Sequence, residues 1–278
     1  IGFEHGGAKR WLSLGPLSIQ PAELLKIFFI IYIATWLSGM KHALGSFLHG
    51  TLPFLGFLSL VGLILLAQPD TDTYLIIVTA SLGTFIVAGG RIRDVILIVC
   101  TGIILMLILA FTRPYVQDRI LTFLDPSRDP QGAGYQINQS LIAIGSGGVF
   151  GRGYGQSIQK FEYLPEPIGD SIFAVFAEEF GFVGSCVLIV CFLAYTLRAF
   201  KISVRAPDLF GMLVVVGLTL LIIAQVFLNI AAMVGLAPLS GLPLPFMSHG
   251  GTALITTLLS IGIVLNISKH QKISRVKA

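Results

Sequence analysis

Long apolar runs separated by short polar connections are the feature that most constrains this chain. The runs cover residues 24–37, 52–67, 74–88, 95–111, 171–197, 209–234 and 252–267. An apolar helix of about 20 residues can cross the hydrocarbon core of a bilayer, and the first run reaches that length if its helix begins at Pro21. We therefore expect an all-α polytopic membrane protein with about seven transmembrane helices, in one membrane domain over residues 1–278.

Composition supports this class and excludes others. The chain is 55% hydrophobic and 12% charged, whereas soluble domains average about a quarter charged residues. Its three cysteines, Cys100, Cys186 and Cys191, all lie in apolar runs, so neither a disulfide framework nor a metal cluster is indicated. The net charge of +4 is small, and we expect no nucleic-acid partner. The chain opens on Ile1 in a polar stretch, which is typical of a sequence whose beginning is absent.

The basic residues predict the orientation. If seven spans alternate across a membrane, one side collects most Lys and Arg, with only two acids, Asp94 and Asp208. These basic residues are Lys41, Arg91, Arg93, Arg198, Lys201, Arg205, Lys269, Lys272, Arg275 and Lys277. Short cytoplasmic loops are enriched in Lys and Arg. That side is therefore predicted to be cytoplasmic, and the long interval 112–170 is predicted to form one large extracytoplasmic loop.

The long loop ends at a group of carboxylates. Asp170 lies where the loop meets the fifth run, and Glu178 and Glu179 follow about two turns later. At a helix start, Asp170 could be a simple N-cap, with Ser171 as the alternative cap, or a functional carboxylate. Adjacent helical residues point about 100° apart, so the two glutamates cannot both face one partner. Glu178 and Glu179 could each have a structural role, paired with another side chain, or take part directly in chemistry.

Several other polar features allow a structural and a functional interpretation. Lys26 and Glu23 share a helical face, so they could form a pair near the interface with Lys26 snorkelling, or Lys26 could face an anionic headgroup. Residues 68–73, QPDTDT, suit a tight turn and an N-cap, or could help to hold a divalent cation. Within the loop, Asp125-Pro126 and Asp129-Pro130 are typical of turns, and 136–144 could form a short helix.

The glycine-rich stretch 145–155, GSGGVFGRGYG, fits either a close backbone approach to a ligand or a plain flexible loop. The sequence contains no Walker, HExxH or GxSxG motif. No soluble-enzyme signature therefore competes with a membrane assignment.

Four stretches resemble one family. They are KRWLSLGPLSIQPAELLK at 9–26, QPDTDT at 68–73, residues 138–180 with LPE, the aspartate, IFA and EE in order, and NIAAMVGLAPLSGLPLPFMSHGG at 229–251. Together they resemble the SEDS family of peptidoglycan polymerases, which includes FtsW and RodA, and they look more like the FtsW branch. The resemblance implies a ten-helix fold of which this chain holds the fourth to the tenth helix.

The resemblance also implies an activity, polymerisation of lipid II into glycan strands during septal wall synthesis. Asp170 matches the essential aspartate and would be the general base. Substrate-binding candidates are Lys26, Trp11, Glu162, Lys160 and Arg152. A divalent cation, Mg or Mn, is expected, with Asp70, Glu162 and Asp170 as candidate ligands. Two other classes stay open, a lipid II transporter and a non-catalytic division scaffold.

The resemblance further implies partners and a location, and it has exceptions. A class B penicillin-binding protein, other divisome proteins and membrane lipids are the expected partners, at the bacterial cytoplasmic membrane and the division septum. The family usually has His-Thr before the aspartate and Phe after it, where this chain has Ile168, Gly169 and Ser171. Asp72 and His249 also replace the usual Gly and Tyr. These differences predict that the environment of Asp170 is set in another way.

Overall fold

The computed structural model describes residues 2–5, 8–14, 17–40 and 44–271, except for the side chains of 2–5, 8, 9, 14, 17 and 162. The chain forms two compact units, and each is described by itself. The first comprises Ile1–Val99, Tyr195–Ala224 and Gly251–Ala278, and the second comprises Cys100–Ala194 and Gln225–Gly250. Three long helices pass from one unit into the other. Whether the chain is one membrane domain stays a prediction.

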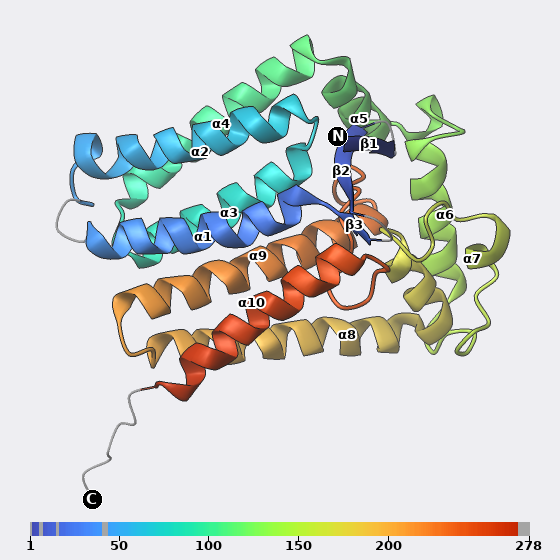
Figure 1. Cartoon of the computed structure of the whole chain (residues 1–278). Helices are drawn as coiled ribbons and strands as arrows, with labels where there is room; N and C mark the ends of the chain where they lie inside the picture. The colour runs from blue at the N-terminus through green and yellow to red at the C-terminus, as the bar shows by residue number, and fades with distance from the viewer. Residues whose placement is uncertain (1, 6–7, 15–16, 41–43, 272–278) are drawn as a thin grey trace, which may run out of the picture. The chain divides into compact units, whose positions relative to one another are not determined.

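The structure is mainly helical (Figure 1). Its helices are α1 (Pro21–Gly39), α2 (Leu52–Ala67), α3 (Thr71–Val87), α4 (Ile92–Thr112), α5 (Pro114–Leu124), α6 (Ala133–Ser146), α7 (Gln159–Glu162), α8 (Ile172–Val204), α9 (Leu209–Met233) and α10 (Gly251–Lys269). A π-helical turn, η1 (Phe47–Thr51), precedes α2, and a 3₁₀ turn, η2 (Pro126–Arg128), follows α5. Each of the seven predicted apolar runs is found in one of these helices.

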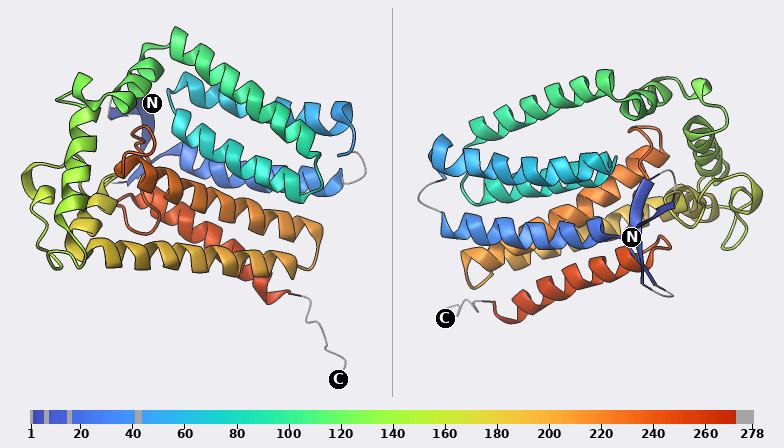
Figure 2. Two further views of the ribbon diagram at one scale, coloured as in Figure 1. Left: turned by 180° about the vertical axis from the view of Figure 1, so that it is seen from behind. Right: turned by 45° about the horizontal axis from the view of Figure 1, so that its top comes forward.

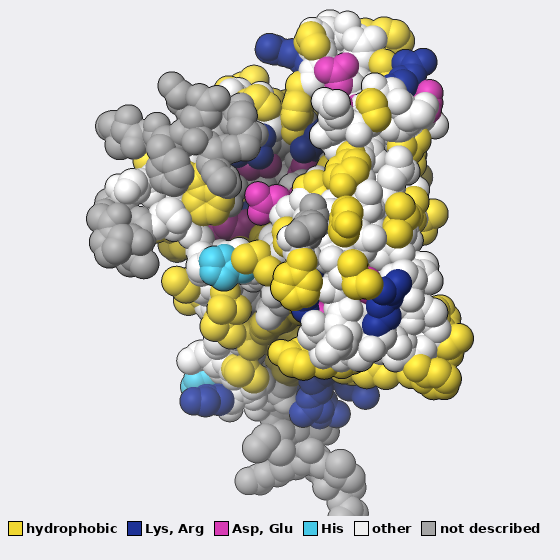
Figure 3. All heavy atoms as spheres, turned by 90° about the vertical axis from the view of Figure 1, so that its right-hand side faces the viewer, with side chains coloured by type: hydrophobic (Ala, Val, Ile, Leu, Met, Phe, Trp, Pro, Cys, Tyr) yellow, Lys and Arg dark blue, Asp and Glu magenta, His cyan; other side chains and the backbone are white. Residues whose placement is uncertain are grey.

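The helix lengths confirm a multi-pass membrane protein. Among the described residues, six helices are long and apolar enough to cross a membrane: α1, α2 with η1, α4, α8, α9 and α10. The seventh predicted span, α3, is a shorter apolar helix of 17 residues, about 26 Å long at 1.5 Å per residue. The sides of these helices carry exposed hydrophobic residues, such as Ile103, Ile104 and Leu107 of α4, as expected for contact with lipid. The face shown in Figure 3, at the loop end, mixes hydrophobic side chains with polar and charged ones.

The first unit is a helical layer with a small sheet at its start. Helix α1 packs against α3 and α10, and α2 packs against α3 (Figures 1 and 2). Helix α9 can approach α1 closely at Gly217, because a Cβ there would come within 2.4 Å of the Ile30 side chain. Before α1, three antiparallel strands, β1 (Gly2–His5), β2 (Ala8–Leu14) and β3 (Leu17–Ile19), form a sheet. Sequence analysis predicted only a polar start there.

The second unit contains the long interval between the fourth and fifth predicted runs. This interval is folded: α5, η2, α6 and α7 follow one another within it. Both predicted turns are confirmed, because Asp125 accepts a hydrogen bond from Ser127 N and Asp129 accepts one from Gly132 N. The predicted short helix at 136–144 is part of α6. A buried cluster formed by Ala143, Leu164, Ala174 and Val175 joins α6, the segment after α7 and the start of α8.

Candidate functional site

Asp170 lies in the second unit, two residues before the first residue of α8. Its Oδ1 accepts a hydrogen bond of 3.1 Å from Nε2 of Gln136 on α6. The same amide nitrogen lies 2.9 Å from Oγ of Ser171, and that hydroxyl donates to Pro165 O at 2.9 Å. The Asp170 side chain is therefore held by a residue 34 positions earlier in the sequence.

The backbone leading to Asp170 is fixed at three successive carbonyls. Ile168 O accepts from His249 N at 2.7 Å, and Gly169 O accepts from the Ser248 hydroxyl at 2.6 Å. Asp170 O accepts from Nδ2 of Asn229 at 2.7 Å. All three donors come from the end of α9 or from the 234–250 segment that follows it. Three carbonyls held in succession restrict where the carboxylate can lie.

Two of these donors also organise the segment they belong to. Nδ2 of Asn229 donates a second bond of 2.8 Å to Leu242 O, and the Ser248 hydroxyl accepts a bond of 2.7 Å from Leu244 N. Ile168 and Gly169, which replace the family's usual His-Thr, contribute backbone carbonyls to this network. Hydrogen bonds to the backbone and the bond from Gln136 thus set the position of Asp170. The side chains directly before Asp170 take no part in this.

The environment of Asp170 changes its proton affinity. Burial raises the pKa of the Asp170 carboxyl to about 6. The hydrogen bond from Gln136 lowers this pKa, and the negative charge of Glu166 raises it. A carboxylate with a pKa near neutrality is ionised at pH 7 and binds a proton more strongly than an ordinary aspartate. This combination suits a general base.

The loop cations predicted to bind substrate both contact glutamates of α8. Nζ of Lys160 lies 2.6 Å from Oε1 of Glu179, and Nε of Arg152 lies 3.5 Å from Oε1 of Glu178. The two adjacent glutamates therefore face different partners, as their angular separation predicted. Glu162 ends α7, and its side chain lies outside the described part of the chain.

The predicted pair of Lys26 and Glu23 is confirmed in the first unit. Nζ of Lys26 lies 2.8 Å from Oε1 of Glu23, one turn earlier on α1. Both residues are buried, at 5% and 3% exposure. The snorkelling interpretation is wrong for this structure, because Lys26 does not extend to solvent. Thr256 on α10 donates to the other carboxylate oxygen, Oε2 of Glu23, at 3.1 Å. The pair thus joins α1 to α10.

The 68–73 turn is an N-cap, as its sequence predicted. Oδ1 of Asp70 accepts from Thr73 N in the first turn of α3 at 3.3 Å. Arg10 on β2, which sequence analysis did not single out, donates to Gln68 O at 3.0 Å and to Pro69 O, and it lies 3.9 Å from Asp70. Burial raises the pKa of Asp70 against the opposing effect of Arg10. Trp11 is the next residue of β2 and is half-buried.

The predicted metal ligands do not form a ready-made cage. Among the residues that the structure describes, no three His, Cys, Asp or Glu side chains are grouped so that they could hold a metal ion. Asp170 and Asp70 each belong to a different unit, and the side chain of Glu162 is not described. The described residues therefore do not fit a metal site made by the protein alone, and the cation stays a prediction.

The fold and this site define a polytopic membrane protein whose long loop presents a partly buried carboxylate of raised pKa. Comparison with known proteins identifies its family: residues 1–273 match the family described as "cell cycle protein", whose members are FtsW, RodA and SpoVE. The chain belongs to this family.

Individual relatives agree with that assignment. The stage V sporulation protein E of Bacillus subtilis is 40% identical over 98% of this chain and 74% of its own length. The probable peptidoglycan glycosyltransferase FtsW of Idiomarina loihiensis is 38% identical over 98% of this chain and 67% of its own length. The match therefore extends along nearly the whole chain and covers two thirds or more of both relatives.

Solved structures give the same fold. A chain from a peptidoglycan synthase complex that coordinates polymerisation and crosslinking has a TM-score of 0.81, with 27% identity over 97% of this chain and 76% of that one. The rod-shape-determining protein RodA of Thermus thermophilus has a TM-score of 0.63, with 28% identity over 98% of this chain and 72% of its own. The predicted SEDS membership and helical, polytopic membrane fold are thereby confirmed, while the count of seven spans and the extracytoplasmic side of the loop stay predictions.

Proposed function

We propose that this chain is a peptidoglycan glycosyltransferase that polymerises lipid II with Asp170 as the general base. The activity class rests on relatives 38% identical along the chain that carry this name. The observation that supports the role of Asp170 is its setting: a carboxylate of raised pKa whose backbone is held at three carbonyls. A general base must be both basic enough and fixed in place.

The reaction can be written in terms of this chain's residues. The 4-hydroxyl of the acceptor's N-acetylglucosamine attacks the anomeric carbon of the donor, and the lipid-linked pyrophosphate leaves with inversion at that carbon. Asp170 takes the hydroxyl proton as the new bond forms, because a sugar hydroxyl is a poor nucleophile until it loses that proton. The Gln136 amide keeps one carboxylate oxygen in place during the transfer.

Cationic side chains are proposed to bind the anionic parts of the substrate. Lys26 would meet a pyrophosphate as a point charge, and in the structure it is paired with Glu23. Lys160 and Arg152, which lie in the loop before Asp170, are further candidates, together with Trp11 and Glu162. A divalent cation, Mg or Mn, is proposed from the family resemblance alone, with Asp70, Glu162 and Asp170 as the candidate ligands.

The partner and the location are proposed on the same basis. The similarity to a chain of a complex that couples polymerisation with crosslinking supports a class B penicillin-binding protein as partner. The FtsW names of the relatives support the septum and other divisome proteins. An extracytoplasmic loop would place Asp170 on the side of the membrane where glycan strands are made.

The test is polymerisation of labelled lipid II by the purified membrane protein. Asp170→Asn should lower kcat by at least about 100-fold, the typical contribution of a general base. Asp125→Asn is the matched control, because Asp125 is an exposed carboxylate of the same loop that also accepts bonds from a serine and a backbone amide. Normal glycan chains from Asp170→Asn would reject the catalytic assignment. Lipid II flipping without polymerisation by the wild type would favour a transporter.

A further inference from the structure

Helix α8 is interrupted at Gly181, where φ is 66° and ψ is −165°. In an unbroken helix, the amides of Phe182 and Val183 would donate to the carbonyls of Glu178 and Glu179. They donate instead to Gly148 O at 2.9 Å and Val149 O at 3.1 Å. The two released carbonyls accept from Arg152 N and Gly153 N, both at 3.0 Å. Residues 148–153 are thus inserted into the hydrogen-bond ladder of α8.

The glycines of this region make that insertion possible. A Cβ on Gly151, whose φ is 81°, would lie 2.1 Å from Glu179 O, and one on Gly181 would lie 2.3 Å from Gly151 N. A Cβ on Gly147 would lie 2.1 Å from Ala177 O. No side chain fits at these contacts. The glycine-rich stretch is therefore a packed contact between two backbones, which corrects the interpretation as a plain flexible loop.

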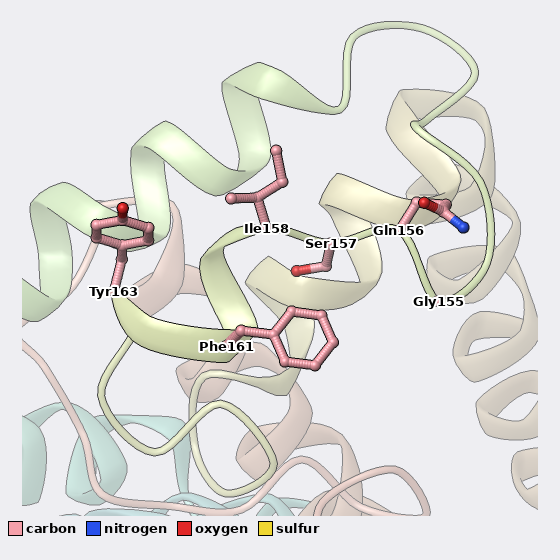
Figure 4. A pocket seen from close by; sticks show the side chains of 6 residues that line it. All are labelled: Gly155, Gln156, Ser157, Ile158, Phe161 and Tyr163. Carbon is pink, nitrogen blue, oxygen red and sulfur yellow. The ribbon is translucent and has the colours of Figure 1, made fainter.

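The inserted segment is followed at once by residues that bind the side chain of Glu178. The Ser157 hydroxyl donates to Oε2 of Glu178 at 2.6 Å. The amides of Ile158 and Gln159, at the start of α7, donate to the same carboxylate at 3.2 and 3.3 Å. Glu178 is fully buried, and Arg152 adds an ion pair. Figure 4 shows Ser157 between the glycine-rich stretch and α7, beside a pocket of about 310 Å³.

Residues 157–170, which we call the arch, are held at three points by α8 or by Ser171 directly before it. Glu178 holds the first end. Leu164, in the middle, is buried against Ala174 and Val175 of α8. At the far end, the Ser171 hydroxyl donates to Pro165 O, and Asp170 follows. The arch is therefore held at both ends and in the middle, at Leu164.

We propose that Glu178 is a positioning residue for the reaction at Asp170. Its buried carboxylate fixes the first end of the arch to α8, and the arch carries that constraint to Lys160 and Asp170. This inference rests on the proposed function, since it assigns Glu178 a role in the same site. Glu178 acts through Ser157 and the first turn of α7 and does not touch the reacting atoms.

The experiment compares Glu178→Gln, Ser157→Ala and the control Asp125→Asn in the full protein. We measure kcat and KM for lipid II polymerisation, the melting temperature, and amide hydrogen exchange along the arch. A neutral amide cannot replace a carboxylate that accepts from three donors and faces Arg152. Glu178→Gln should therefore lower kcat at least about 10-fold and speed exchange within residues 157–164. Ser157→Ala should do the same to a smaller extent, and Asp125→Asn should change neither quantity.

Each outcome decides the proposal. Normal kcat and normal exchange in Glu178→Gln would overturn it. Lower kcat with unchanged exchange in the arch would also overturn it, because Glu178 would then act in some other way. If Glu178→Gln does not fold, Ser157→Ala decides on the same two criteria. Normal polymerisation by Asp170→Asn marks failure of the proposed function. An inactive Asp170→Asn together with fully active Glu178→Gln and Ser157→Ala marks failure of this inference alone.

Discussion

The carboxylate of Glu23 in the first unit and that of Asp170 in the second are held in opposite ways. Glu23 meets its main partner, Lys26, one helical turn away on α1. The carboxylate of Asp170 accepts from Gln136, 34 residues away, and its carbonyl accepts from Asn229, 59 residues away. Ser248 holds the carbonyl of the neighbouring Gly169 across 79 residues. One carboxylate is placed by the local geometry of a helix and the other by the tertiary fold.

The difference matters for chemistry as well as for folding. Glu23 forms an ion pair with the ammonium group of Lys26, and its other carboxylate oxygen accepts a hydrogen bond from Thr256. Asp170 has a neutral amide as its side-chain partner, and burial raises its pKa to about 6. The first carboxylate is therefore the counter-ion of a buried lysine, and the second is suited to accepting a proton.

Breaking the local pair should have the largest effect on stability. Glu23→Gln leaves Lys26 buried without its carboxylate, and removal of one partner of a buried pair costs about 3–5 kcal/mol. We expect a fall in melting temperature of the purified protein. The double variant Glu23→Gln with Lys26→Met removes both charges and should recover most of that loss. A double variant as unstable as the single one would contradict the pairwise account.

That double variant also separates folding from function. If Lys26 binds the pyrophosphate, the recovered protein should still polymerise lipid II at least about 10-fold more slowly, because a charge-assisted contact is worth roughly 1.5–3 kcal/mol. The loss should be seen in kcat/KM for lipid II. Wild-type kcat/KM in a stable double variant would restrict Lys26 to a structural role.

Sequence analysis could predict the first region better than the second for a physical reason. The apolar runs, the start of α1 at Pro21 and the cap at Asp70 depend on neighbours within a few residues, and all are found in the structure. Asp170 was identified through family resemblance. Its side-chain partner Gln136 could not be identified, because no local pattern tells which distant polar side chain will face Asp170. The motif at 229–251 was the one signal that pointed to Asn229 and Ser248.

The tertiary support of Asp170 can be tested at Asn229. Asn229→Leu leaves the carbonyls of Asp170 and Leu242 without their donor, so the backbone at Asp170 is expected to shift. A misplacement of about 1 Å at a reacting group can lower the rate about 100-fold. We expect a fall in kcat of between about 10- and 100-fold, measured by lipid II polymerisation. Unchanged kcat would show that Asp170 is fixed without Asn229.

Ser248→Ala should have a smaller effect than Asn229→Leu. It removes the donor to Gly169 O and the acceptor for Leu244 N, while the neighbouring bond from His249 N to Ile168 O remains. We expect kcat to fall by up to about 10-fold, equivalent to roughly 1.4 kcal/mol. The same assay measures it, with Asp125→Asn as control. An effect larger than that of Asn229→Leu would reverse the proposed order of the two supports.

The smallest effects should appear in the pH dependence. A general base must be ionised, so the rate should fall as pH drops through the Asp170 pKa of about 6 and reach a plateau above it. Glu166→Gln removes a negative charge that raises this pKa, so the acidic limb should move to lower pH. Gln136→Leu removes a hydrogen bond that lowers the pKa, so the limb should move to higher pH.

Opposite shifts from these two variants would be hard to explain by general damage, since both act on one titration from opposite directions. The profile of kcat/KM against pH reports the free enzyme and is the quantity to measure. Equal shifts in the same direction would mean that another group controls the limb. If neither variant shifts the acidic limb of the kcat/KM profile, Asp170 does not titrate in the step that limits kcat/KM. Asp170 and Glu23 would then differ only in how the fold holds them.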